Sequence, residues 1–455
     1  MILPGLLGTD PAAAGTDALR ALAAAGWPDG GEPRPAVLVA TPPARTNPFA
    51  GLLYRDLPDV RVLPVAVPDP VAAAALATRL HELTAGTVGC VVHLHWLHRV
   101  TATARDAPAA RAAVQEVTAA LTTARAAGAR VLWTVHNRAP HRPRFPDAEL
   151  ALRRAAADLA DVVHVMNPRT PELVAATSPL DPAKVRCVPH PSYAGAYPDT
   201  VTRARARQLL GIPAGAVVFA ALGRLQPYKG LTALADAFQT LAATAPGRYR
   251  LVVAGAVDGV GPGPVRARPG PADPETTALL HRLARSRDIV CLPLAVPDDQ
   301  VQVVLRAADV AVVPNLDPLN SGAELLAMTF GVPVVTTGDV PADAGWGMWA
   351  PPGDAPALAG VLRAAVDRLA GPGAGAARAA ALARAEAVAP SVVGPVFARL
   401  VRELLDHPNP AGPGAADPGG VAPSTGQPTG PPAGPSTAPS TGEPAGQHAD
   451  RTEDR

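Results

Sequence analysis

The chain has 455 residues, which is enough for two domains of ordinary size and an additional segment. Its 40 Lys and Arg residues nearly balance its 39 Asp and Glu residues, and the net charge of +1 gives no general electrostatic basis for binding nucleic acid. The three cysteines, Cys90, Cys187 and Cys291, lie far apart in or beside apolar runs. They favour free thiols in a reducing compartment over a disulfide framework.

The beginning of the chain does not have the features of a secretory signal. Met1 to Leu7 has no basic start, and Asp10 follows soon after this short apolar run. No window of about 18 residues is apolar and free of charge, so no membrane span is predicted. We expect a cytoplasmic protein, and the sequence leaves weak peripheral membrane association and the oligomeric state open.

Strands and helices alternate along the first half of the chain. Residues 1–35 form a loose lead-in with a weak Ala-rich helix. Strands are predicted at residues 36–41, 60–67, 88–95, 130–137, 161–166 and 184–188. Helices are predicted after Phe49 and near residues 71–83, 108–127 and 148–160. This alternation predicts a parallel, doubly wound sheet.

The second half repeats the pattern after an interdomain linker at residues 189–199, which has no clear period. Strands are predicted at residues 216–222, 249–254, 288–292, 309–313 and 332–336, with helices between them and near 355–370, 374–388 and 392–405. Residues 257–274 read as a surface loop. Their Gly259-Val-Gly-Pro-Gly263 run is no dinucleotide fingerprint, because its proline lacks an N–H and no helix starts at the required place.

We therefore predict an α/β protein with two Rossmann-like, doubly wound parallel-sheet domains. The proposed division is a lead-in (1–35), a first domain (36–190), a second domain (191–389), a last helix (390–406) and a tail (407–455). The tail has no aromatic residue, Leu, Ile or Met and is rich in Pro, Gly, Ser and Thr, so we expect it to be disordered.

Two loops of the second half carry candidate anion-binding groups. Val310–Val313 reads as a buried strand, and Ser321 caps the following helix, so Ser321 and Gly322 present backbone N–H groups at a helix N-terminus. Arg224 and Lys229 follow the strand at 216–222, at the sheet edge where ligands bind in such folds. A guanidinium and an ammonium beside a helix N-terminus suit a diphosphate. The alternatives are an ordinary structural cap and solvated surface charge.

Histidines follow the third and fourth strands of the first half. His93, His95 and His98 lie at the end of one strand, and His136 lies at the end of the next. His95 and His136 follow buried runs, so they should converge on one cleft, whereas His98 and His141 are more typical of structural residues. Metal binding is a competing interpretation, but no carboxylate lies at ligand spacing from this pair. We expect no metal and no cofactor.

These stretches together resemble the GT-B glycosyltransferases, in particular the large retaining family 4 with its glycosyltransferase family 1 type of domain. The resemblance covers about residues 36–406. The matching residues are Gly223-Arg224-Leu225, Lys229-Gly230, Ala308-Asp309-Val310, Pro314, Ala327-Met328, Gly331-Val-Pro-Val-Val335, Val91–Trp96, Trp133–His141, Asn47-Pro48-Phe49 and His190–Tyr193.

The resemblance implies a hexosyltransferase that uses a nucleoside-diphosphate sugar, retains the anomeric configuration and needs no metal, in polysaccharide biosynthesis or a related route. It implies catalytic roles for His95, His136, Arg224 and Lys229, and donor-phosphate binding by Arg224, Lys229, Ser321 and Gly322. Contacts to the donor sugar or acceptor would come from Asn47, His95, His136, Asn137 and His190. The nucleobase would lie near residues 291–296, and the last helix would return to the first domain.

One departure concerns a pair of glutamates that the family commonly carries. Their slots are occupied here by Pro318 and Leu326. Glu324 is two residues from the second slot, about 200° round the helix, so it does not simply substitute. Asp317 is the other nearby acid, and both acids are doubtful site residues.

Three functions stay open at this point. The first is glycosyl transfer to an unidentified acceptor, which could be a polysaccharide, a glycolipid or a small glycoside. A nucleotide-sugar epimerase on the same architecture is the second, since a fold does not fix a reaction. A non-catalytic nucleotide- or sugar-binding scaffold is the third.

Overall fold

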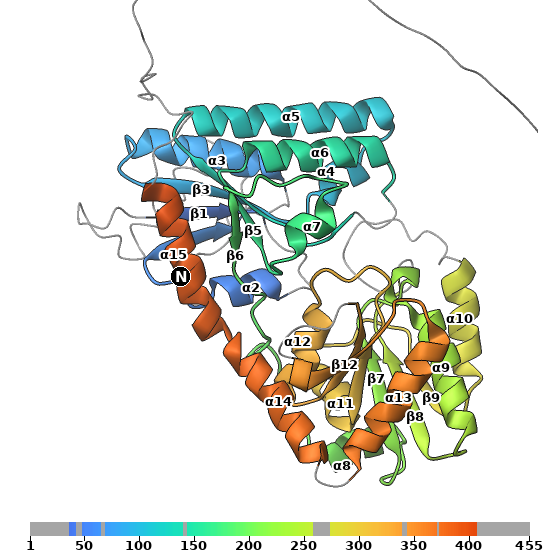
Figure 1. Ribbon diagram of the computed structural model, residues 1–455. Helices are drawn as coiled ribbons and strands as arrows, with labels where there is room; N and C mark the ends of the chain where they lie inside the picture. The colour runs from blue at the N-terminus through green and yellow to red at the C-terminus, as the bar shows by residue number, and fades with distance from the viewer. Residues whose placement is uncertain are drawn as a thin grey trace, which may run out of the picture. The chain divides into compact units, whose positions relative to one another are not determined.

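The computed structural model describes residues 36–41, 48–64, 69–139, 143–257, 274–338, 344–370 and 373–406. Two six-stranded sheets, both entirely parallel within these residues, organise this part of the chain (Figure 1). This confirms the predicted α/β class with two doubly wound sheets. The lead-in, the residues from 258 to 273 and the tail lie outside the described residues.

The first sheet has the strand order β2-β1-β3-β4-β5-β6. Its strands are β1 (Ala36–Ala40), β2 (Val60–Pro64), β3 (Gly89–Leu94), β4 (Arg130–Thr134), β5 (Val162–Val165) and β6 (Val185–Cys187). The chain adds β2 on one side of β1 and then β3 on the other, so the order reverses between β1 and β3. In open α/β sheets, ligands bind outside the carboxyl ends of the strands at such a reversal. Thr41 and His95 follow these two strands.

Both faces of this sheet are buried, and alternate residues of β1 show how. Val37 and Val39 pack with α3, α5 and α6, while Leu38 and Ala40 face α2 and α15. Figure 1 shows α3, α5 and α6 side by side. The helices of this part are α2 (Phe49–Tyr54), α3 (Pro70–Leu83), α4 (His98–Ala102), α5 (Ala107–Ala126), α6 (Pro146–Leu159) and α7 (Thr170–Val174).

The second sheet has the strand order β12-β11-β10-β7-β8-β9. Its strands are β7 (Val217–Leu222), β8 (Tyr249–Ala254), β9 (Ile289–Leu292), β10 (Val310–Val313), β11 (Val334–Thr337) and β12 (Gly347–Ala350). The order reverses between β7 and β10, so the loops that follow these two strands flank the expected ligand position. These are the two loops that carry Arg224, Lys229, Ser321 and Gly322.

Helices again cover both faces of the second sheet. They are α8 (Arg203–Leu209), α9 (Leu231–Ala243), α10 (Pro274–Ala284), α11 (Val301–Ala307), α12 (Gly322–Thr329), α13 (Ala355–Leu369) and α14 (Gly373–Ala387), with 3₁₀ turns η1 (Pro227–Lys229) and η2 (Ala344–Trp346). Helix α15 (Pro390–Asp406) packs on α2, β1 and β3 of the first sheet. Its Phe397 is fully buried there.

The observed elements differ from the predicted ones at a few places. β12 was not expected from the sequence, because Gly-Met-Trp-Ala is short and has no clear alternation. The strand expected to reach His136 ends at Thr134, so His136 and Asn137 lie in the loop beyond β4. Within the described segments, no helix combines the length and apolar character needed to cross a bilayer.

Candidate active site

A chain of polar side chains crosses the carboxyl end of the first sheet, and we call it the histidine chain. Its members are Tyr54, His93, His95, Thr134, His136 and His164. At its outer end, Nδ1 of His95 lies 3.0 Å from Nε2 of His136. The Tyr54 hydroxyl lies 2.6 Å from Nε2 of His95 and 2.6 Å from Nδ1 of His93. The two histidines that the sequence predicted to converge are therefore in direct contact.

The inner half of the histidine chain runs on from His93. Its Nε2 lies 2.7 Å from the Thr134 hydroxyl, which is 2.9 Å from Nδ1 of His164. Nε2 of His164 lies 2.8 Å from the backbone oxygen of Val188. The ring of Phe397 on α15 stacks on His93 at 5.4 Å between centroids and closes this end from solvent. Strands β3, β4 and β5 thus contribute to one unbroken hydrogen-bonded line.

The direction of every hydrogen bond in the chain follows from its inner end. A carbonyl oxygen can only accept, so His164 donates from Nε2 to Val188 and accepts at Nδ1 from Thr134. Each neutral imidazole and each hydroxyl has one proton to donate, so the same assignment repeats outward link by link. It ends with Nε2–H of His136 donating to Nδ1 of His95. Nδ1 of His136 is left as a hydrogen-bond acceptor.

Burial keeps these histidines neutral, as the assignment requires. It lowers the pKa of His95 to about 3 and the pKa of His164 to about 4. Burial also lowers the pKa values of His93 and His136 well below the ordinary range, and neighbouring histidines add to the shift because two positive charges would repel. At neutral pH the chain is a set of fixed dipoles rather than charges.

Aromatic rings hold the outer histidines in place. Trp96 stacks on the ring of His136 at 4.0 Å between centroids and 17° between planes. Phe49 meets the ring of His136 edge-on at 5.0 Å and that of His190 at 4.7 Å. His190 donates from Nδ1 to the Pro191 oxygen at 2.7 Å, which leaves its Nε2 as an acceptor.

On the second sheet, the Lys229 loop packs directly against the loop that follows β10. Gly230 has a φ of 65°, and a Cβ added there would lie 2.0 Å from the backbone oxygen of Pro314. The backbone N–H of Leu316 donates to the oxygen of Tyr228 at 2.9 Å. Only glycine allows this approach, so Gly230 ties the two predicted anion-binding loops together.

The N-terminus of α12 has the predicted cap. The Ser321 side chain accepts from the backbone N–H of Glu324 at 3.4 Å. A Cβ added to Gly322 would lie 2.4 Å from the Tyr193 hydroxyl and 3.4 Å from Nε2 of His190. The helix therefore begins against two side chains of the 189–199 segment, and His190 reaches the residue that starts α12.

The loop before α12 also contacts the first sheet. Asn320 donates from its side chain to the backbone oxygen of Val135 at 3.3 Å, one residue before His136. Asp317 forms an ion pair with Arg138 at 2.8 Å, two residues after His136. These contacts bring the start of α12 next to the loop that carries His136 and Asn137.

Glu324 turns toward the sheet and Lys229. It accepts from the Thr336 hydroxyl at 2.8 Å, at the carboxyl end of β11. Burial raises the pKa of Glu324, and its hydrogen bonds and Lys229 oppose that shift. Burial likewise lowers the pKa of Lys229, and Glu324 opposes it. The two groups thus stabilise each other's charge. Glu324 therefore does not take the place of the family's second glutamate, whose position is Leu326 in this chain.

The other sequence candidates lie as follows. Arg224 is exposed on the loop after β7, and Asn137 is partly buried beside His136. Asn47 and His141 lie outside the described residues. Among the described side chains, no group of three or more His, Cys, Asp or Glu residues is arranged to hold a metal ion. Both nitrogens of His95 are already engaged by Tyr54 and His136.

Sequence reasoning missed Tyr54, Thr134 and Trp96. A usable signal existed for Thr134, which stands two residues before His136, as His93 stands two before His95. Residues two apart in a strand share a face. No sequence signal pointed to Tyr54, which reaches the chain from α2.

A family model described as glycosyl transferases group 1 matches residues 216–368, which include β7 to β12 and the whole Lys229 and Ser321 region. Residues 216–368 are a glycosyl transferases group 1 domain. The D-inositol 3-phosphate glycosyltransferase of Kineococcus radiotolerans is 33% identical over 158 residues, 34% of this chain and 34% of that protein. A second such protein, from Catenulispora acidiphila, is 35% identical over 133 residues, 29% of each chain. These matches thus span about a third of the relatives' length.

Solved structures extend the likeness over both sheets of this chain. A glycosyltransferase from Rickettsia africae has a TM-score of 0.57 at 13% identity, covering 83% of this chain and 100% of that one. Anabaena Alr3699/HepE in complex with UDP and glucose has a TM-score of 0.55 at 16% identity, covering 81% of this chain and 99% of that one. The likeness establishes the two-sheet GT-B fold.

Proposed function

We propose that this chain is a glycosyltransferase that moves a sugar from a nucleoside-diphosphate sugar, held by the group 1 domain, to an acceptor beside His136. The observation that carries the proposal is the Asn320–Val135 hydrogen bond of 3.3 Å, which links the loop before α12 to the loop that carries His136. A donor whose phosphates contact the helix N-terminus would present its sugar to the histidine chain. In this proposal, residues 36–190 form the acceptor-side domain and residues 191–389 the donor-side domain.

The diphosphate would bind to Lys229, Arg224 and the backbone N–H groups at Ser321 and Gly322. A helix N-terminus favours negative charge, and Lys229 stands at the same sheet reversal. As the sugar leaves, negative charge grows on the diphosphate, and these groups stabilise it. The partial burial of Lys229 strengthens that interaction, because nearby water screens it less.

The transferred sugar would contact His136, Asn137 and His190, with Asn47 as a further candidate. His95, which is buried with both ring nitrogens engaged, would act by orienting His136. Nδ1 of His136 and Nε2 of His190 are acceptors in the hydrogen-bond assignment above. They would therefore accept hydrogen bonds from sugar hydroxyls. Tyr54 and Thr134 act through His95 and are positioning residues.

The proposed reaction is retaining and independent of a metal. Asp317 is paired with Arg138, and Glu324 faces Thr336 and Lys229, so neither carboxylate is set to attack the sugar from His136's side. Same-face displacement needs no such nucleophile. The acceptor oxygen attacks the anomeric carbon as the bond to the phosphate breaks, and the leaving phosphate takes the acceptor's proton.

UDP-glucose is the first donor to test, because the Anabaena neighbour was solved in complex with UDP and glucose. D-inositol 3-phosphate is a first acceptor because two relatives are named for it. The deciding experiment incubates the full chain with UDP-, GDP- and ADP-sugars and an acceptor panel, and measures release of free nucleoside diphosphate together with glycoside formation. Conversion of the nucleotide sugar to an isomer would indicate the epimerase. Binding with no release of diphosphate would indicate the scaffold.

A further inference from the structure

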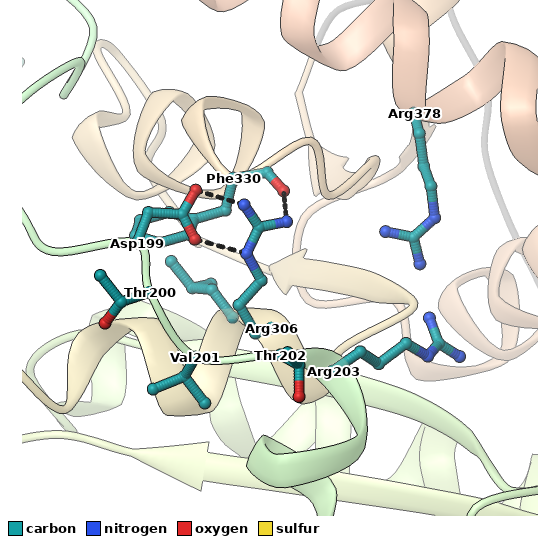
Figure 2. A pocket seen from close by; sticks show the side chains of 9 residues that line it. Asp199, Thr200, Val201, Thr202, Arg203, Arg306, Phe330 and Arg378 are labelled. Carbon is teal, nitrogen blue, oxygen red and sulfur yellow. Dashed lines mark hydrogen bonds and ion pairs between the residues drawn. The ribbon is translucent and has the colours of Figure 1, made fainter.

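A pocket of about 280 Å³ lies at the amino-terminal edge of the second sheet, away from the proposed donor site (Figure 2). Its walls include Arg306 at the end of α11, which leads into β10, and Phe330 at the end of α12. Ser321 begins α12 at the donor edge, so the length of that helix separates the two places. A volume near 300 Å³ is at the small end of sites for organic ligands.

The charges around this pocket do not balance. Four guanidinium groups meet two carboxylates: Arg306 pairs with Asp199, and three arginines share Asp309. The three that share Asp309 are Arg203, Arg207 and Arg378. Four positive and two negative charges leave a surplus of two positive charges. The side chains of Arg203, Arg306 and Arg378 are 43%, 34% and 32% exposed, so these three guanidinium groups are open to an anion that enters from solvent.

The sharing of Asp309 is unequal, and it leaves Arg378 with the weakest partner. One carboxylate oxygen accepts from Arg207 at 2.7 Å and from the backbone N–H of Val218 at 2.9 Å. The other lies 2.5 Å from Arg203 and 3.5 Å from Arg378. Asp309 is 7% exposed, and its two oxygens already have these four partners. A purely structural role for the cluster accounts for Arg207 but needs neither Arg203 nor Arg378.

Figure 2 shows the guanidinium groups of Arg378 and Arg203 facing one another beside the paired Arg306. Arg378 is half-buried on α14, and burial together with the repulsion from Arg203 lowers its pKa. Asp309 opposes that shift only in part. The threonine side chains of Thr200 and Thr202 line the neighbouring wall.

We propose that this pocket is a binding site for a small phosphate monoester, with the phosphate on Arg378 and Arg203. A monoester dianion carries the two negative charges that balance the surplus, and planar guanidinium groups bind phosphate oxygens in pairs. The hydroxylated remainder of the ligand lies against Thr200 and Thr202. This site is separate from the diphosphate site at Lys229 and does not depend on the proposed glycosyl transfer.

The test uses the full chain at pH 7.5 and fixed ionic strength, with glycerol 3-phosphate, inorganic phosphate and UDP as separate probes. Binding is measured by titration calorimetry and by the shift in melting temperature, since a ligand that binds only the folded state raises it. Arg378→Gln should weaken glycerol 3-phosphate and phosphate binding about ten-fold or more and leave UDP affinity unchanged, because a hydrogen bond to a charged group is lost.

Two control variants locate the effect. Arg363→Gln removes an exposed arginine of α13 outside the pocket. It should change neither the affinity for the two phosphate probes nor the affinity for UDP. Lys229→Ala should weaken UDP binding and spare glycerol 3-phosphate. The proposal is wrong if neither phosphate probe binds, if Arg378→Gln leaves their affinities intact, or if Lys229→Ala abolishes their binding. Because UDP and the phosphate probes are measured separately, failure here is distinct from failure of the proposed donor site.

Discussion

Nε2 of His136 donates to Nδ1 of His95 across 3.0 Å, and this single hydrogen bond fixes which nitrogen of His136 is available to a substrate. The tautomer of His136 is determined far from its own ring. The hydrogen bonds that continue from His95 through Tyr54 and the inner histidines end at the backbone oxygen of Val188, which can only accept. This pair, which follows β3 and β4, is thus the outer end of the histidine chain. Its consequences can be measured.

Replacing His136 should affect turnover far more than nucleotide affinity, because the proposed nucleotide site lies on the other sheet. His136→Ala should be worse than His136→Asn, whose amide oxygen can still accept a hydrogen bond. Initial rates and UDP affinity are measured for both variants, with EDTA-treated wild type alongside. Equal loss of UDP affinity and turnover, or an EDTA-sensitive rate that zinc or manganese restores, would contradict the assignment.

Tyr54→Phe should break the histidine chain without changing its shape. It removes the hydroxyl that lies 2.6 Å from both His93 and His95, and it leaves two buried nitrogens without a partner. We expect a loss of about 1–3 kcal/mol in the free energy of unfolding and reduced turnover. Tyr249→Phe is the control, because Tyr249 is 3% exposed in the core of the second sheet. Equal effects from both variants would remove the special role of Tyr54.

Thr134→Val tests the assigned direction of the hydrogen bonds in the histidine chain. The hydroxyl that connects His93 to His164 is lost, so Val188 no longer dictates the protonated nitrogen of the outer histidines. Ring-nitrogen chemical shifts in histidine-labelled protein should show His136 protonated at Nε2 in the wild type and a mixture of tautomers in the variant. A wild-type His136 protonated at Nδ1 would refute the assignment.

Stability should fall as the pH drops from about 6.5 toward 4. The pKa of His95 is lowered to about 3 and those of His164 and His190 to about 4, so the folded state binds few protons where an unfolded histidine, with a pKa near 6.5, binds one. The contribution of these histidines to the free energy of unfolding is therefore fully present above pH 6.5. Below pH 6.5 it falls by about 1.4 kcal/mol per pH unit for each histidine.

Two other groups act in the opposite direction over part of that range. Burial raises the pKa values of Glu149 and Glu324, so the folded state gains protons there as the pH falls. Five histidines with lowered pKa values outnumber them. Urea unfolding at pH 7.5, 6.5, 5.5 and 5.0 measures the net slope, and an unchanged free energy of unfolding across this series would overturn the expectation.

Lys229→Ala and Arg224→Ala should each weaken nucleoside-diphosphate binding about ten-fold or more and leave nucleoside binding nearly unchanged. Each removes a charge-assisted hydrogen bond to phosphate, which contributes about 1.5–3 kcal/mol. Titrations with UDP and uridine measure the difference. If uridine affinity falls as much as UDP affinity, the two residues act on structure instead.

Gly230→Ala should be much more damaging than Gly211→Ala, although both glycines have a φ of 65°. Both variants carry the cost of a left-handed alanine, roughly 1–2 kcal/mol. Only at position 230 does the new Cβ collide with a backbone oxygen, at 2.0 Å, whereas position 211 has open space. Melting temperatures and UDP affinities separate the two costs. Similar UDP affinity in both variants would show that the Gly230–Pro314 approach does not shape the donor site.

The sequence by itself determined the local elements of this protein. Buried β-branched runs marked most strands, the Ser321 cap marked the start of α12, and the order of strands and helices indicated two parallel sheets. These signals are local, because propensity, capping and periodicity act within a few residues. The placement of His95 and His136 at strand ends followed from the same reasoning, and so did the shared edge of the Lys229 and Ser321 loops.

The tertiary structure alone decided which distant groups meet. Tyr54, Thr134 and Val188 belong to one hydrogen-bonded line only because α2, β4 and the segment after β6 are folded onto the same sheet. The turn of Glu324 toward Thr336 depends in the same way on the pairing of β10 with β11. Side-chain partners across a parallel sheet depend on strand order, which is decided only when strands that are distant in the sequence pair with one another.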